Sequence, residues 1–196
     1  KQLYGGLGYN PFNPAMAAFC LMIVAYPALL SQWPAAGLLD ARTQLELIFG
    51  GVRQIDAITG ATPLDALRTA LRGAADPAST LHGLRAGQLM DGPAFGLVGG
   101  RGGEWVGLGY LIGGLWLLQR RIITWHIPTA FCAALFAVAS LLWALKPEGF
   151  ASPLFHLASG GAMLGAFFIL TDPVSGATTA RGKLLFAAGA GILTYV

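Results

Sequence analysis

The stretch that decides the fold is "PAMAAFCLMIVAYPALLSQW", residues 14–33, which contains no charged side chain. A helix needs about 20 apolar residues to cross the hydrocarbon core of a bilayer. Asn13 and Pro14 are typical of a helix N-terminus, because Asn caps the first amides and Pro lacks an amide that would need a partner. The stretch therefore predicts a membrane-spanning helix.

The rest of the composition agrees with a membrane protein. Hydrophobic residues make up 55% of the 196 residues and charged residues only 11%, whereas about a quarter of the residues of a soluble protein are charged. Four more spans are predicted at about 105–119, 127–145, 150–171 and from 184 onward. We expect an all-α, polytopic transmembrane bundle of about five spans, with residues 1–196 as a single membrane domain. The start at Lys1 and the end in an apolar run suggest a fragment that lacks N-terminal helices.

Residues 34–93 form the one sizeable polar region, with five arginines against six acidic residues. The short connections between the later spans instead carry basic pairs, Arg120 with Arg121 and Arg181 with Lys183. Basic residues favour the cytoplasmic side in short loops. Residues 34–93 are therefore predicted to be one long extracytoplasmic loop.

That loop contains "DAITGAT", residues 56–62, followed directly by Pro63. In one interpretation, Thr59 or Thr62 caps the helix predicted for "PLDALRTALRG", with Pro63 in the first helical position and Asp65 in the first turn. In the other, the Thr62 hydroxyl is presented to an enzyme or ligand. Both can hold, because a helix N-terminus also favours phosphate.

The same residues carry a family resemblance. "DAITGAT" is similar to the Asp-x-x-Ser/Thr-Gly-Ala-Thr/Ser signature at which a flavin transferase attaches FMN through a phosphoester. The stretches "GGLGYNPFNPAM", "RIITWHIPTAF" and "TDPVSGATTARGKLLF" resemble the RnfD subunits of the Rnf ion-translocating ferredoxin:NAD oxidoreductases. This family is related to the NqrB subunit of the sodium-translocating NADH:quinone reductase.

The resemblance implies FMN on Thr62, with Asp56, Thr59, Gly60 and Ala61 as the rest of the binding signature. A second copy, "DPVSGAT" at residues 172–178, makes Thr178 the second-choice flavin site. It directly precedes the basic residues at 181 and 183 and is expected on the cytoplasmic face, whereas the transferase is expected to work outside.

The resemblance also implies a function: a membrane subunit of an ion-translocating electron-transport complex, in which covalent FMN relays electrons and the flow is coupled to Na⁺ or H⁺ movement. A noncovalent riboflavin is a second expected cofactor. The expected partners are the other subunits of the complex, including iron–sulfur and flavin subunits, the flavin transferase and membrane lipid, in a bacterial inner membrane. No nucleic acid is expected as a partner, because the arginines are scattered rather than clustered with aromatic residues. No metal site is expected, since Cys20 and Cys132 lack a ligand spacing. No catalytic residue is assigned, and the chain is not expected to be catalytic alone.

A solute transporter or channel is the alternative function. Broken helix entries at "NPFNP" and "TDPVS" could line a solute path, because discontinuous helices often mark membrane binding sites, but this hypothesis does not explain "DAITGAT". His156 lies inside the fourth predicted span. An ionisable group there is either functional or a packing residue hydrogen-bonded to Ser152 or Ser159. The coupling ion and the direction of electron flow stay open.

Overall fold

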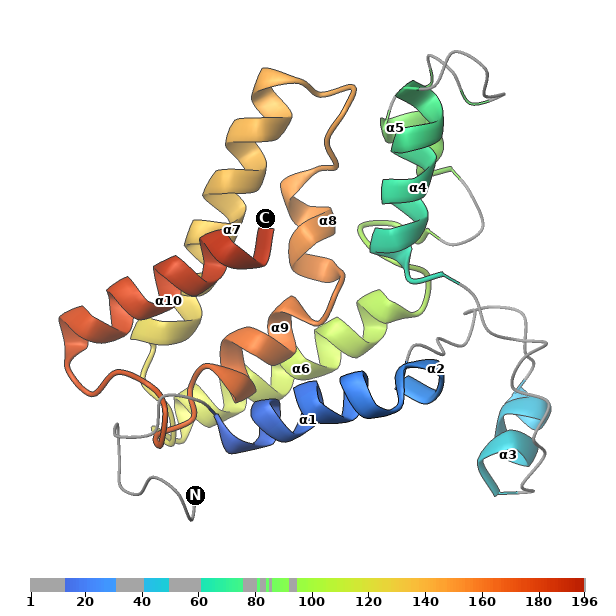
Figure 1. Cartoon of the computed structure of the whole chain (residues 1–196). Coiled ribbons are helices and arrows are strands. Elements are labelled where there is room, and N and C mark those ends of the chain that lie inside the picture. Colours follow the sequence, from blue (N-terminus) through green and yellow to red (C-terminus); the bar gives the residue numbers. More distant parts are fainter. Residues whose placement is uncertain are drawn as a thin grey trace.

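The computed structural model describes residues 13–30, 41–49, 61–75, 86–91 and 95–195, together with Leu81 and Leu84. Within these ranges the regular structure is helical, apart from one isolated bridge between Phe95 and Gly100 (Figure 1). The all-α prediction is therefore confirmed for the described residues. The elements are α1 (Pro14–Ala25), α2 (Pro27–Leu30), α3 (Ala41–Phe49), α4 (Pro63–Ala75), α5 (Ala86–Leu89), α6 (Gly103–Gln119), α7 (His126–Leu145), α8 (Pro153–Ala158), α9 (Ala162–Leu164), the π-helix η1 (Gly165–Ile169) and α10 (Ala180–Tyr195).

The first predicted span begins as expected but is not one helix. The Asn13 side chain accepts hydrogen bonds from the amides of Ala15 (2.9 Å) and Met16 (3.3 Å), so it caps α1. Helix α1 ends at Ala25, and α2 begins at Pro27. Proline restricts the residue before it to extended backbone and has no amide to continue the helix. The prediction of a single helix over residues 14–33 is therefore wrong.

Helices α6 and α7 confirm the second and third apolar stretches as helices. Helix α7 has 20 residues and is, among the described residues, the one helix long and apolar enough to cross a membrane by itself. Helix α6 has 17 residues. The two are joined by the turn that contains the basic pair at residues 120 and 121.

The fourth predicted span is interrupted. Helix α8 ends at Ala158, and the chain resumes helical structure only at Ala162. Gly160 and Gly161 between them have φ angles of +66° and +72°, a conformation that favours glycine. Beyond the interruption, the helix widens into η1, where the Leu170 amide donates to the Gly165 carbonyl at 2.9 Å. A continuous helix over residues 150–171 is therefore wrong, because the Ser-Gly-Gly sequence leaves helical backbone.

The main core lies where α7, α10 and the second half of the interrupted span meet. Its buried residues are Ile127, Phe131, Leu135, Ala162, Ala166, Phe167 and Ala187. Glycines permit the closest approaches: a Cβ added to Gly191 of α10 would lie 2.6 Å from the carbonyl oxygen of Phe131. Gly114 of α6 lies in the same way directly against the Phe167 ring.

A second core places part of residues 34–93 on the bundle. The helix predicted for "PLDALRTALRG" is present as α4, and the same region also contains α3. Leu67 of α4 is only 4% exposed, and it packs with Leu89, Ala151 and the fully buried Phe155 of α8. The segment that follows "DAITGAT" is thus fixed against the start of α8.

Candidate functional site

Thr62 is the residue directly before α4 and caps its N-terminus. The amide of Asp65 donates to Thr62 Oγ1 at 3.3 Å, and the amide of Ala66 donates to the Thr62 carbonyl at 2.8 Å. The prediction of a threonine cap is confirmed for Thr62, with Pro63 in the first helical position. Ala61 is exposed. Asp56, Thr59 and Gly60 lie outside the described residues.

The amphipathic pattern of α4 determines how Thr62 is held. Leu67 is buried in the second core, with Leu64 and Leu71 packed against it. Asp65 in the first turn and Arg72 in the last turn are exposed. Their charges have the signs that stabilise the two ends of a helix dipole. One face of α4 is therefore anchored, while Asp65 in its first turn stays exposed and Thr62 is half-buried.

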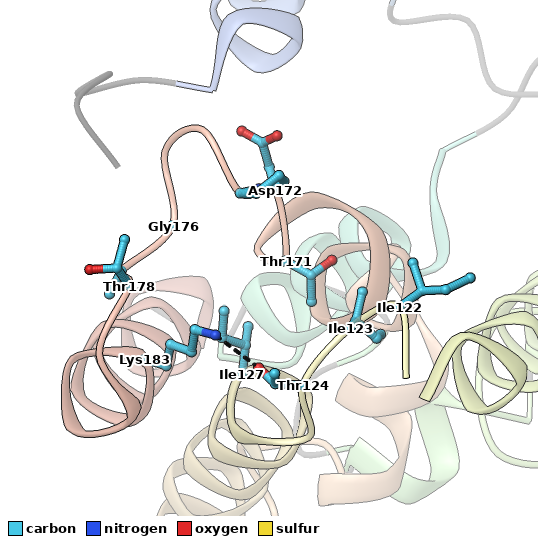
Figure 2. A pocket seen from close by; sticks show the side chains of 11 residues that line it. Ile122, Ile123, Thr124, Ile127, Thr171, Asp172, Gly176, Thr178 and Lys183 are labelled. Atoms are coloured by element: carbon cyan, nitrogen blue, oxygen red, sulfur yellow. Dashed lines mark hydrogen bonds between the residues drawn. The ribbon is translucent and has the colours of Figure 1, made fainter. Parts of the chain in front are cut away.

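Thr178 lies in a different environment. It lines a cavity of about 260 Å³ together with Asp172 and Lys183, and Lys183 Nζ donates to Thr124 Oγ1 at 3.2 Å (Figure 2). The hydroxyl that caps α10 belongs to the next residue, because the Gly182 amide donates to Thr179 Oγ1 at 3.1 Å. Thr178 is exposed and precedes that cap. The two copies of the signature are therefore not equivalent in structure.

The two candidate threonines lie near opposite ends of α6. Pro63, next to Thr62, lies directly against Gly100, which comes just before α6. The cavity at Thr178 is lined by residues 122–124, which follow α6. A 17-residue helix is about 25 Å long at about 1.5 Å per residue. The two sites are therefore separated by most of the length of the bundle.

A third feature, which the sequence did not predict, is a cavity beside α4 that is lined mostly by apolar residues and also by a few polar ones. It has a volume of about 650 Å³, and its lining includes Arg68 and Arg72 of α4, His156 of α8 and Tyr195 of α10. The His156 and Tyr195 ring centroids are 4.7 Å apart. Its lining comes from α4, α7, α10 and the segment 149–162, which are far apart in the sequence, so no local pattern could have revealed it.

His156 does not have the hydrogen bonds that its neighbours suggested. Its buried Nε2 has no partner among the described residues. The Ser152 hydroxyl oxygen instead accepts the Phe155 amide at 3.3 Å, and that of Ser159 accepts the Gly100 amide at 3.2 Å. The interpretation of His156 as a residue hydrogen-bonded to these serines is therefore wrong for Nε2. The Nε2 atom remains an unpaired polar group at the edge of the cavity.

These features together define a class of protein. It is an apolar helical bundle with an interrupted helix and, at one end, a helix capped by the last threonine of the "DAITGAT" signature. Comparison with known proteins then identifies the family. The sequence model of the NQR2, RnfD, RnfE family matches residues 1–196, and the chain belongs to this family. The resemblance found in the sequence is confirmed.

Individual relatives agree with this assignment. A protein from Pseudomonas paraeruginosa, named as the D subunit of an ion-translocating oxidoreductase complex, is 50% identical over 201 residues, covering 100% of this chain and 55% of the relative. Proteins of the same name from Alcanivorax borkumensis and Cronobacter sakazakii are 48% and 44% identical, covering 100% of this chain and 55% and 58% of their own lengths. The chain spans about half the length of the curated relatives it matches.

Proposed function

We propose that this chain belongs to a membrane subunit that carries FMN covalently on Thr62 and relays electrons within an ion-translocating oxidoreductase complex. The observation that carries the proposal is the position of Thr62: the last residue of the flavinylation signature is also the residue that opens α4. The family membership of the whole chain supports it. The names of the relatives, each one part of a complex, support the place in an assembly.

The residues around Thr62 fit a phosphoester. A helix N-terminus presents amide hydrogens and the positive end of its dipole, both of which favour a phosphate. The preceding Ala61 is small and exposed, and Pro63 has no amide hydrogen to bury. Bound FMN supplies the redox chemistry, whereas the protein holds the attachment oxygen and orients the group. Noncovalent riboflavin is proposed as a second flavin, without an assigned site.

The described surface is consistent with a bilayer. Large apolar side chains are exposed on helices far apart in the sequence, among them Val24 of α1 (81%), Trp105 of α6 (70%) and Leu145 of α7 (72%). A helix that is apolar all round belongs in a core or in a membrane. We therefore propose a multi-pass protein of the bacterial inner membrane, with about five spans in this chain and residues 34–93 outside.

The complex must contain other redox centres. No group of three or more histidine, cysteine, aspartate or glutamate residues that could hold a metal is found in the part of the chain that the structure describes. We propose that neighbouring iron–sulfur and flavin subunits exchange electrons with this one, that a separate transferase attaches the FMN, and that the assembly couples the flow to Na⁺ or H⁺ transport.

Substitution of the two threonines tests the proposal. The full-length protein is expressed with its complex and the transferase, and covalent flavin is detected by fluorescence in a denaturing gel. Thr62→Ala should remove the fluorescent band because the attacking oxygen is gone, whereas Thr62→Ser and Thr178→Ala should keep it. A fluorescent Thr62→Ala band with a dark Thr178→Ala band would transfer the site to the other end of the bundle.

The interruption between α8 and α9 favours a second candidate, a solute transporter or channel, because broken helices at membrane depth often form binding sites. The two hypotheses differ in colour and transport. Full-length protein that is free of covalent flavin and conducts a solute in vesicles supports the transporter. Covalent flavin on the protein supports the electron relay.

A further inference from the structure

We propose that Gly100 sets the position of Thr62 through close packing against Pro63. We also propose that Gly100 connects the flavin attachment point to the interruption between α8 and α9. This inference rests on the proposed attachment of FMN to Thr62. Gly100 does not touch the flavin chemistry itself, so it is a positioning residue. Its contacts on two sides carry the inference.

On one side, Gly100 supports the first residue of α4. A Cβ added to Gly100 would overlap the ring of Pro63, meeting its Cγ and lying only 2.7 Å from its Cβ. Carbon atoms prefer separations of about 3.5–4.0 Å, so even alanine does not fit unless α4 shifts. The proline ring cannot rotate away as a longer side chain can, because it is closed onto its own backbone. Pro63 therefore passes any displacement directly to Thr62.

On the other side, Gly100 is tied to the interrupted helix. Its buried amide donates to Ser159 Oγ at 3.2 Å, and Ser159 is the first residue after α8. Gly100 also lies at the start of α6, because the Glu104 amide donates to its carbonyl at 3.2 Å. Figure 1 shows this segment passing the beginning of α4 before α6 starts.

A second contact joins α4 to the interruption between α8 and α9. A Cβ added to Gly160 would lie 2.5 Å from Leu64 Cδ1, so the residue after Pro63 packs on the interruption itself. The Leu64 side chain ends in rotatable bonds and can move away. The contact of Leu64 with Gly160 therefore fixes the position of α4 less firmly than the contact of the Pro63 ring with Gly100. The first two residues of α4 thus both lie against glycines.

The chain offers a matched control for this geometry. Gly103 lies three residues from Gly100, as the first residue of α6, and an added Cβ there meets nothing within 4 Å. Neither glycine has a positive φ, so the backbone conformation does not strain alanine at either position. Gly100→Ala and Gly103→Ala differ chiefly in the contact with Pro63.

The experiment uses the full-length protein in its complex and has two readouts. The first is the rate at which trypsin cuts α4 at the exposed Arg68 and Arg72. This rate reports how stably α4 is packed against the rest of the bundle. The second is the midpoint potential of the covalently attached flavin. Gly100→Ala should speed cleavage and shift the potential, Gly103→Ala should match the unsubstituted protein, and Pro63→Gly combined with Gly100→Ala should return to the values of Pro63→Gly alone.

Further variants decide the case if Gly100→Ala fails to assemble. Ser159→Ala removes the oxygen that accepts the Gly100 amide and should change both readouts in the same direction. Its control is Ser152→Ala, which removes an oxygen that accepts only a local amide of α8. If the two glycine variants, or the two serine variants, show the same cleavage rate and the same midpoint potential, the positioning role of Gly100 is wrong. Absence of flavin on Thr62 contradicts the proposed function instead. The trypsin cleavage rate then still tests whether Gly100 holds α4 in position.

Discussion

At the scale of the residue, one oxygen of Thr62 has two roles that substitution can separate. As a hydroxyl, Thr62 Oγ1 accepts the Asp65 amide and caps α4. As a nucleophile, it is the atom that we propose to carry FMN. Loss of an N-cap costs about 0.5–2 kcal/mol of stability, which is small beside the packing that holds α4.

We expect Thr62→Asn to keep the cap and lose the flavin. Asparagine caps helices at least as well as threonine, but its amide group cannot form the phosphoester. The variant should therefore show trypsin resistance of α4 like that of the unsubstituted protein and no covalent flavin in a denaturing gel. Thr62→Ala is the control in which both change. Covalent flavin on the Thr62→Asn protein would show that another residue is the attachment site.

At the scale of the element, the interrupted span is held by contacts that only small residues allow. Gly114 of α6 lies against the ring of Phe167 in η1. A π-helix is rare and is seen mostly as a short segment within α-helices, frequently at functional sites. The contact with α6 fixes η1 in place next to the main core.

Alanine at two glycines of α6 should have opposite effects. At Gly114 the added methyl group overlaps Phe167, and overpacking a core typically costs about 1–3 kcal/mol. At Gly109 an added Cβ meets nothing within 4 Å, and alanine favours a helix over glycine by about 1 kcal/mol. Thermal unfolding of the full-length protein in detergent should show a lower midpoint for Gly114→Ala and an unchanged or higher one for Gly109→Ala. A lower midpoint for both would contradict the close contact with η1.

The elements differ in how well the sequence predicts them. Helices α6 and α7 followed from apolar runs of suitable length, and the caps at Asn13 and Thr62 followed from local chemistry. The breaks at Pro27 and at the Ser-Gly-Gly of residues 159–161 are visible in the sequence, but the apolar runs around them predict uninterrupted spans. Because length and hydropathy average over such residues, they predict a span and conceal its interruption.

The site was predictable only where it is local. The threonine cap needs four consecutive residues, so the sequence was sufficient for it. The contact of Pro63 with Gly100 joins residues that are far apart along the chain, and the cavity at His156 joins α4, α7, α8 and α10. Such contacts depend on how the helices pack, which the hydrophobic pattern of one chain does not determine.

At the scale of the whole molecule, the two copies of the signature lie near opposite ends of α6. The signature threonine and α4 lie near the start of α6, whereas the basic residues after α6 and the Lys183–Thr124 hydrogen bond lie near its end. From the bias of basic residues toward the cytoplasm, we propose that Thr62 and Thr178 lie on opposite sides of the membrane.

Cysteine labelling in spheroplasts tests this orientation. The cysteines of the full-length protein, Cys20 and Cys132 among them, are first replaced by alanine, and single cysteines are placed at the exposed Thr69 of α4 or the exposed Gln119 at the end of α6. A membrane-impermeant maleimide should label position 69 in intact spheroplasts and position 119 only after permeabilisation. The reverse pattern would invert the topology and make Thr178 the outward-facing threonine.

The most direct test of the central claim is peptide mapping by mass spectrometry of the full-length protein purified from cells that contain the flavin transferase. Trypsin cuts after Arg53 and Arg68, so Thr62 falls in the peptide 54–68, whereas Thr178 falls in the peptide that ends at Arg181. We predict that peptide 54–68 carries the mass of FMN minus water, and that fragmentation assigns it to Thr62 and not to Thr59. An unmodified peptide 54–68, with the added mass on the Thr178 peptide or on none, would contradict the account.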